Sequence, residues 1–131
     1  MRRLVASARV GRLVTVAPDG RPRVVPFCFA LDGDTLYSAV DHKPKSTVHL
    51  RRLDDIRRQP EATVLVDHYE EDWSRLWWVR VRGAARVVDA GAEQARARDL
   101  LAAKYEQYRA VPPAGPVIVV AIEEWVGWSS T

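Results

Sequence analysis

Two lysines stand where a predicted strand gives way to a predicted helix. Lys43 and Lys45 lie in the segment AVDHKPKS, residues 39–46, after an apolar run that ends at Val40. Backbone N–H groups at the start of a helix bind anions, and the helix dipole already makes that end positive. Acidic residues are the usual choice there, so two lysines suggest that a bound anion offsets them. A solvated basic loop is the alternative, and charge counting alone favours neither.

Hydroxyl groups and further cations surround this junction. Ser46 fits the N-cap position of the helix, and Thr47 offers a second hydroxyl. Arg51 and Arg52 follow one turn further along. Together these groups could hold a phosphate. The chain contains neither a Gly-rich P-loop nor a GxGxxG motif, so nucleotide-binding folds of those kinds are not supported.

The sequence carries no motif for catalysis by its own side chains. His42, His49 and His68 are scattered, and the lone Cys28 cannot complete a zinc set, so no metal site is expected. The serines stand in no nucleophile-elbow motif, and the acidic run at 70–72 is typical of a solvated hairpin loop. A cofactor that carries its own chemistry is therefore the attractive hypothesis.

Length and composition narrow the class of protein. A chain of 131 residues predicts one domain, residues 1–131. The net charge of +3 comes from arginines interspersed with acids, which suits an anionic ligand and argues against a nucleic-acid partner. One cysteine allows no intrachain disulfide, and no apolar run approaches the roughly 20 residues that span a membrane. We therefore expect a cytoplasmic protein without a membrane partner.

Hydrophobic periodicity and turn motifs predict an α+β fold with a barrel-like antiparallel sheet. The short turns at 18–22 and 32–34 join the first three strands into a meander of hairpins. Pro26 is expected at an edge or bulge, and Gly83 at a bulge. The predicted strands are 12–17, 23–31, 35–40, 62–69, 75–89 and 117–128; the predicted helices are 46–58 and 92–109, with the end of another at 2–10.

The order of these segments resembles a known family. The stretches ARVGRLVTVAPDGRPRVVPFCFALDGDTLYSAVDHKPKST, LRRLDDIRRQPEATVLVDHY and WWVRVRGAARVV are similar to the split β-barrel flavin-binding superfamily typified by pyridoxamine 5′-phosphate oxidase. Within it, the chain looks most like an actinobacterial branch of coenzyme F420-dependent oxidoreductases. The resemblance covers nearly the whole chain. It implies a six-stranded antiparallel split β-barrel, of the FMN-binding split barrel type, with flanking helices.

The resemblance also implies where a cofactor would bind. Such proteins are homodimers with two cofactor sites at the subunit interface. The phosphate is held after the third strand, the ring lies along the second and third strands, and the fourth and last strands of the partner complete the pocket. The residues that match are Val25, Pro26, Phe27, Ser38, Ala39, Val40, Lys43, Lys45, Ser46, Thr47, Asp67 and Trp78, with residues 125–128 as further candidates.

The implied activity is hydride transfer between reduced F420 and a small unsaturated organic substrate. The alternatives are an FMN-binding oxidoreductase of the pyridoxamine 5′-phosphate oxidase type and a non-catalytic carrier of F420 or flavin. The chain ends WVGWSST and lacks the oxidases' C-terminal Arg-Leu segment, which lowers the expectation of pyridoxamine phosphate oxidation. The catalytic residues are not assigned. For the substrate's proton, the alternatives are solvent, Tyr37, Tyr69 and His68.

Overall fold

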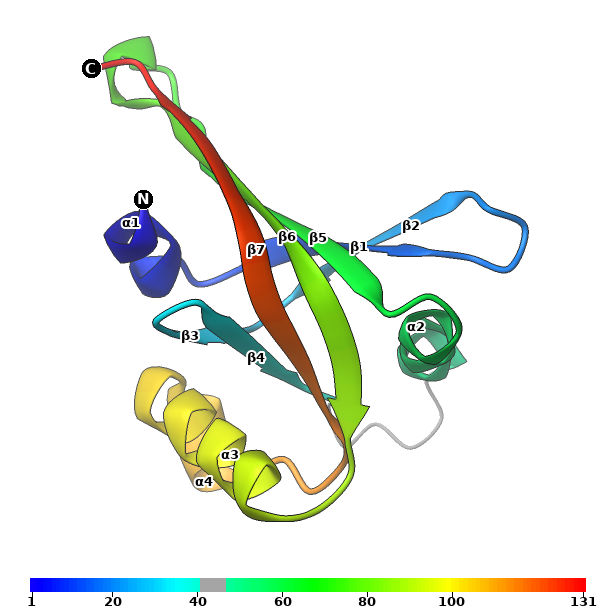
Figure 1. The fold of residues 1–131 in the computed structure, drawn as a ribbon. Helices are drawn as coiled ribbons and strands as arrows, with labels where there is room; N and C mark the ends of the chain where they lie inside the picture. The colour runs from blue at the N-terminus through cyan, green and yellow to red at the C-terminus, as the bar shows by residue number, and fades with distance from the viewer. Residues whose placement is uncertain (41–46) are drawn as a thin grey trace.

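The fold is an antiparallel sheet flanked by helices (Figure 1). It is described by a computed structural model of residues 1–40 and 47–131, with only the backbone described for residues 47–50. The strands are β1 (Gly11–Val16), β2 (Pro22–Phe27), β3 (Ala30–Asp32), β4 (Thr35–Ala39), β5 (Glu61–His68), β6 (Trp77–Val88) and β7 (Val117–Ser129). The helices are α1 (Arg2–Ser7), α2 (Thr47–Arg58), α3 (Ala92–Lys104) and α4 (Glu106–Ala110), with a 3-10 turn η1 (Trp73–Arg75).

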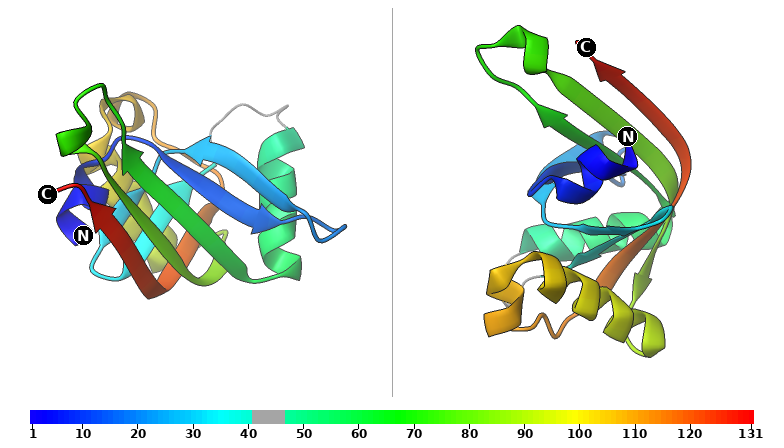
Figure 2. Two further views of the ribbon diagram at one scale, coloured as in Figure 1. Left: turned by 90° about the horizontal axis from the view of Figure 1, so that it is seen from above. Right: turned by 90° about the vertical axis from the view of Figure 1, so that its left-hand side faces the viewer.

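The sheet curls because its two edges are joined by a very short link. Its strands run in the order β2-β1-β5-β6-β7-β4-β3, so β2 and β3 lie at opposite ends. Only Cys28 and Phe29 separate these strands in the chain. Three residue steps span at most about 11 Å, which forces the edges toward each other. The strongly bent sheet in Figure 2 follows from this constraint, and the α+β antiparallel split barrel is confirmed.

Within the described residues the sheet has seven strands, so the predicted count of six is wrong. The expected strand 23–31 is divided into β2, which pairs with β1, and β3, which pairs with β4. The hairpins at both predicted turns are confirmed. The predicted meander of three neighbouring strands is not formed, because β2 and β4 do not pair with each other. Phe27 and Phe29 are both buried and stack with 5.4 Å between ring centroids. Because burial alternates without interruption across Cys28, the hydrophobic pattern of the sequence does not indicate that the strand ends there.

Two predicted irregularities of the sheet are confirmed. Pro26 lies on β2, an edge strand, where its missing N–H costs no ladder bond on the outer side. The β6–β7 register shifts between Arg82 and Gly83. A Cβ at Gly83 would lie 1.9 Å from the Ala121 carbonyl oxygen, so no side chain fits at this bulge.

The predicted helix 92–109 is interrupted at Tyr105. This residue has an extended backbone, with φ −115° and ψ 120°, between α3 and α4. Ala97 and Leu101 on α3 are fully buried, as their spacing predicted. The break brings the Tyr105 hydroxyl within 3.1 Å of the Phe29 backbone nitrogen, which donates to it. Helical periodicity in the sequence does not predict an interruption that depends on a tertiary hydrogen bond.

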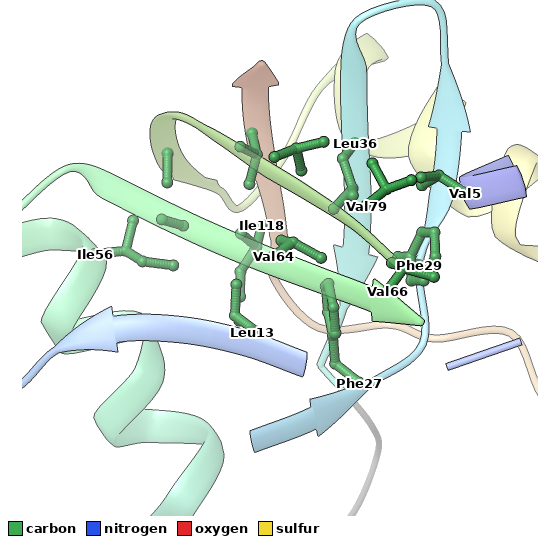
Figure 3. Close-up of a cluster of buried hydrophobic side chains, with 14 of the residues drawn as sticks. Val5, Leu13, Phe27, Phe29, Leu36, Ile56, Val64, Val66, Val79 and Ile118 are labelled. Carbon is green, nitrogen blue, oxygen red and sulfur yellow. The ribbon is translucent and has the colours of Figure 1, made fainter. Parts of the chain in front are cut away.

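The main hydrophobic core fills the inside of the curled sheet (Figure 3). Helix α2 covers one side of it with Leu53 and Ile56, which are almost fully buried. The first half of β7, residues 117–120, is a continuous apolar run that is buried on both faces. The labelled core residues are Val5, Leu13, Phe27, Phe29, Leu36, Ile56, Val64, Val66, Val79 and Ile118.

An acidic residue holds α2 against the ends of β1 and β2. The Asp55 side chain is 1% exposed and accepts hydrogen bonds from Thr15 Oγ1 at 2.9 Å and Arg23 Nε at 2.7 Å. Arg58 lies 3.4 Å away on the same helix. Burial alone would raise the pKa of Asp55, but these hydrogen bonds outweigh it and lower the pKa. The contact fixes the rotation of α2 and hence the position of Arg52, one turn earlier.

Candidate cofactor site

A cavity of about 200 Å³ lies where β2, β4, α2 and α4 meet. It is lined by Val10, Pro26, Phe27, Cys28, Ser38, Ala39, Arg52 and Tyr108. Four of these residues, Pro26, Phe27, Ser38 and Ala39, are among those predicted to contact a cofactor ring. They come from strands that do not pair with each other, since β2 pairs with β1 and β4 pairs with β3 and β7.

A side-chain hydrogen bond connects two parts of the cavity wall that are not joined by backbone hydrogen bonds of the sheet. Ser38 Oγ donates a hydrogen bond of 2.8 Å to the Cys28 carbonyl oxygen. This bond joins β4 to the link between β2 and β3. It also satisfies the carbonyl of a residue that stands outside any strand. The wall at Cys28 is therefore fixed although the sheet is open there.

Side chains at the end of α3 also contact the link between β2 and β3. The Tyr105 hydroxyl lies 2.9 Å from the Arg9 carbonyl oxygen and 3.0 Å from the Phe29 carbonyl oxygen, either of which can accept its proton. Lys104 Nζ donates to the Phe29 carbonyl oxygen at 2.9 Å. Burial raises the pKa of Tyr105 to about 12. Burial, with the charge of Arg9, lowers the pKa of Lys104 to about 8. These groups support the wall and do not line the cavity.

Among the described residues, one charged side chain lines this cavity of mixed polar and apolar surface. Among the side chains that the structure describes, Arg52 is the only arginine or lysine that is buried, with 5% exposure. Val10, Pro26 and Phe27 supply apolar surface, and the proline offers no N–H group. Such a cavity can accept a flat ring and present a cation to its polar edge.

The remaining predicted ring contacts of the second and third predicted strands do not line the cavity. Val25 and Val40 pack against the main core. Thr47 begins α2, where only its backbone is described. The predicted phosphate ligands Lys43, Lys45 and Ser46 lie outside the described residues. The phosphate site therefore stays a prediction.

Asp67 and Trp78 lie on a different surface. They line an open groove of about 410 Å³ on the outer face of β1, β5 and β6. Their neighbours in β5 and β6, Val66 and Val79, are buried on the core side, as strand alternation requires. Thus the predicted cofactor residues do not form one site within a single chain. The groove is lined by Val14, Thr63, Leu65, Asp67, Tyr69, Trp78 and Arg80.

Of the further candidates at 125–128, Trp125 contacts residues near the N-terminus and the β3–β4 turn. Its Nε1 donates to Asp34 Oδ1 at 3.2 Å, and the Arg2 guanidinium lies 5.0 Å from the centroid of its ring. Trp128 is opposite Trp78 in the β6–β7 register and is 47% exposed. Trp128 therefore extends the aromatic surface of the outer face, whereas Trp125 does not line either cavity.

Three residues of the 200 Å³ cavity were missed as cofactor contacts, and a fourth, Arg52, was expected only at a phosphate. Tyr108 belongs to the predicted helix 92–109, which is remote in sequence from the strands of the cavity. Cys28 stood within an apolar run. Arg52 was grouped with Arg51 as a phosphate ligand, but Arg52 and Asp55 are both buried on α2 while Arg51 is exposed. That i, i+3 pair is the signal that could have found it. The missed residues are Val10, Cys28 and Tyr108.

None of the three side chains considered as proton donors lines this cavity. Tyr37 is buried in the second core cluster beneath α3. Tyr69 lines the outer groove, and His68 contacts Glu70. Side chains with exchangeable protons that do line the cavity are Cys28, Ser38, Arg52 and Tyr108.

Comparison with known proteins identifies the family. Residues 1–129 match the family described as pyridoxamine 5′-phosphate oxidase, and the chain belongs to this family. No match was found among curated proteins. Within the described ranges, no three His, Cys, Asp or Glu side chains are grouped so that they could hold a metal ion, and no helix is long and apolar enough to cross a membrane.

Solved structures share the fold at low sequence identity. A conserved hypothetical protein from Mycobacterium tuberculosis is 18% identical with a TM-score of 0.78, over 98% of this chain and 81% of that one. The FAD binding protein from Mycobacterium smegmatis is 20% identical with a TM-score of 0.68, over 96% and 90%. The heme binding protein from the same organism is 18% identical with a TM-score of 0.74, over 98% and 56%. One fold thus carries different ligands, and the ligand must be argued from the site.

Proposed function

We propose that this protein is an oxidoreductase that binds coenzyme F420 and transfers a hydride between it and a small unsaturated organic substrate. The observation that carries the proposal is the shared cavity of Pro26, Phe27, Ser38 and Ala39. These residues match the strands that hold the ring in the family that the chain resembles. The cofactor, when bound, supplies the hydride chemistry.

The size of the cavity suits part of a cofactor. Pockets for drug-sized ligands usually measure about 300–1,000 Å³, and this cavity measures about 200 Å³. Among its described residues, the apolar side chains and the one cation, Arg52, fit a planar ring better than a phosphate-bearing tail. Other walls must therefore enclose the remainder of the cofactor.

A second copy of the chain is the proposed source of those walls. Asp67 and Trp78 match family positions that complete the pocket, but they line the outer groove and not the cavity. A homodimer would allow the groove of one copy to complete the site of the other. Leu65 and Tyr69 in the groove, with 36% and 72% exposure, offer apolar surface for such a contact.

The chain's own residues would act by position, by excluding water and by supplying a proton. Phe27 and Val10 present apolar surface that keeps water from one side of the ring. The Ser38 hydroxyl is directed to the Cys28 carbonyl, so it holds the wall. Tyr108 and Cys28 carry protons at the cavity, which makes them better placed to protonate a substrate than Tyr37 or His68. Tyr69 lines the outer groove, so it would reach the site only from the second copy.

An FMN-binding oxidoreductase is the second candidate. It is supported by the structural likeness to an FAD binding protein. Titration of the purified protein with F420 and FMN, side by side, separates the two. Tight F420 binding without FMN binding supports the proposal, and a yellow preparation that contains FMN overturns it in favour of FMN.

A non-catalytic carrier is the third candidate and needs a separate assay. Reduced F420 bound to the protein is mixed with a panel of unsaturated acceptors, and its oxidation is followed by absorbance. Oxidation above the rate of free reduced F420 supports an enzyme. Micromolar binding without any oxidation favours the carrier.

A further inference from the structure

Arg52 is a buried cation on the wall of the 200 Å³ cavity, and the proposed hydride chemistry gives it no role so far. Its residue exposure is 5%, whereas the adjacent Arg51 is exposed. The Asp55 contacts described above fix the helix that carries it. Electrostatic contacts are stronger in such a partly enclosed, low-dielectric place than at the surface.

The chemistry of the cavity indicates what this cation recognises. A guanidinium is planar and can donate two parallel hydrogen bonds to paired acceptors. Val10, Pro26 and Phe27 form the apolar part of the same wall, where a flat ring fits and a hydrated phosphate does not. The ring's carbonyl-bearing edge is the better match.

We propose that Arg52 is the specificity-determining residue of this cavity: its guanidinium binds the oxygen-bearing edge of the cofactor ring and favours the reduced ring over the oxidised one. The proposal rests on the proposed function. A hydride brings one proton and two electrons, so the reduced ring carries one negative charge more than the oxidised ring until it takes up a further proton. A cation fixed at the ring edge stabilises that added charge.

The test compares Arg52→Gln with Arg51→Gln. Both variants remove one charge from the same turn of α2, but only Arg52 lines the cavity. The probes are FMN and lumiflavin, which is the ring without the phosphate tail, and F420 with its own tail-free deazaflavin ring. Affinity is measured by fluorescence titration for the oxidised forms and anaerobically for the reduced forms.

The expected result is specific to the ring and to its redox state. Arg52→Gln weakens binding of the oxidised tail-free ring about 10-fold, as expected for a lost charge-assisted hydrogen bond, and of the reduced ring about 100-fold. The extra tenfold lowers the midpoint potential of the bound two-electron couple by about 30 mV. Arg51→Gln leaves both affinities within about twofold. A loss for FMN or F420 with no loss for its tail-free ring shows a phosphate contact and overturns the proposal, as does equal behaviour of the two variants.

A measurement on the unmodified protein covers the case in which Arg52→Gln does not fold. The bound ring should have a more positive midpoint potential than the free ring, and a more negative one overturns the proposal. Arg52→Lys, which keeps the charge and loses the planar fork, should retain the redox preference but bind the ring more weakly. If the unmodified protein binds none of the four probes, the proposed function fails and this inference fails with it. If it binds a probe and the two Gln variants agree, only this inference fails.

Discussion

Ser38 Oγ donates a 2.8 Å hydrogen bond to the carbonyl oxygen of Cys28. Cys28 lies in the link between the edge strands β2 and β3, Ser38 lies on β4, and both residues line the 200 Å³ cavity. No β-ladder is formed between β2 and β4, because each pairs with other strands. The shape of this wall therefore depends on a side-chain hydrogen bond, which a single substitution can remove.

Replacing Ser38 with Ala should lower the free energy of unfolding by about 1–2 kcal/mol, because it removes the hydroxyl that satisfies a partly buried carbonyl group. Urea unfolding followed by tryptophan fluorescence measures the change. Ser7→Ala is the matched control, since Ser7 Oγ donates to the Leu4 carbonyl oxygen at 3.3 Å on an exposed helix. Equal effects of the two substitutions would contradict a special role for the Ser38 contact.

Asp55→Asn should destabilise the fold by about 3 kcal/mol, because it leaves Arg23 and Arg58 without the carboxylate that they share. Asp54→Asn removes a carboxylate from the adjacent, 70% exposed side chain and should change stability by less than about 0.5 kcal/mol. Thermal and denaturant unfolding of both variants provides the comparison. A small effect of Asp55→Asn would mean that apolar packing alone fixes α2.

The same residue predicts part of the acid sensitivity. The pKa of Asp55 is lowered in the folded state, so its stabilisation is present above the ordinary value of 3.8 and is lost as the pH falls through the lowered value. Asp55→Asn should therefore lose less stability than the unmodified protein when the pH is lowered below about 4.

Lys104 predicts a rise in stability on the alkaline side. Its pKa is lowered from 10.5 to about 8, so the folded state binds this proton less tightly than the unfolded state. The free energy of unfolding therefore rises with pH between about 8 and 10.5. Tyr105, whose pKa is raised from 10.0 to about 12, acts in the opposite direction above pH 10. The effect of Lys104 on stability can therefore be measured without that of Tyr105 between about pH 8 and pH 10.

Lys104→Met is the variant that tests this slope. Denaturant unfolding at several pH values in that range should show a smaller rise than in the unmodified protein, whatever the variant's absolute stability. Other titrating groups are the same in both proteins, so the difference between their slopes isolates Lys104. Parallel pH profiles would show that the ammonium keeps its ordinary pKa.

Local chemistry in the sequence was enough to predict much of the sheet. The Asp-Gly and Gly-Asp turns placed two hairpins, and Gly83 marked the bulge opposite Ala121. The division of residues 23–31 into two strands was not predictable in this way. Phe27 and Phe29 are buried on the same side across the break, so the alternation gives no signal there.

The candidate site was predictable only where strand order sufficed. Pro26 and Ser38 lie in segments that the family resemblance had already matched to the ring. Arg52 and Tyr108 reach the cavity through the rotation of α2 and the interruption at Tyr105, both of which are set by tertiary hydrogen bonds. Asp67 and Trp78 face the opposite side of the sheet from Val66 and Val79, as the alternation of side chains along a strand predicts. Their match to the same pocket as Pro26 and Ser38 came from the family resemblance and did not use this alternation.

Lys43→Ala combined with Lys45→Ala tests the predicted phosphate site. If both lysines contact the phosphate, the double variant should bind the cofactor about 2–4 kcal/mol more weakly, by loss of charged hydrogen bonds. The stability of the cofactor-free protein should not fall, because two cations leave a helix N-terminus. Isothermal titration gives the affinity, and Arg21→Ala, which alters an exposed turn, is a control. An unchanged affinity would reject the phosphate assignment.

Leu65→Glu tests whether the outer groove is covered by a second copy of the chain. Leu65 lies among Val14, Trp78 and Tyr69 on the outer face, and a carboxylate there would be desolvated in a dimer interface. We expect the unmodified protein to sediment as a dimer and the variant to shift to monomer with weaker cofactor binding. Val111→Glu places the same charge on another exposed apolar residue, outside the groove, and should stay dimeric. A monomeric unmodified protein with full cofactor affinity would show that Asp67 and Trp78 are not needed to complete the site.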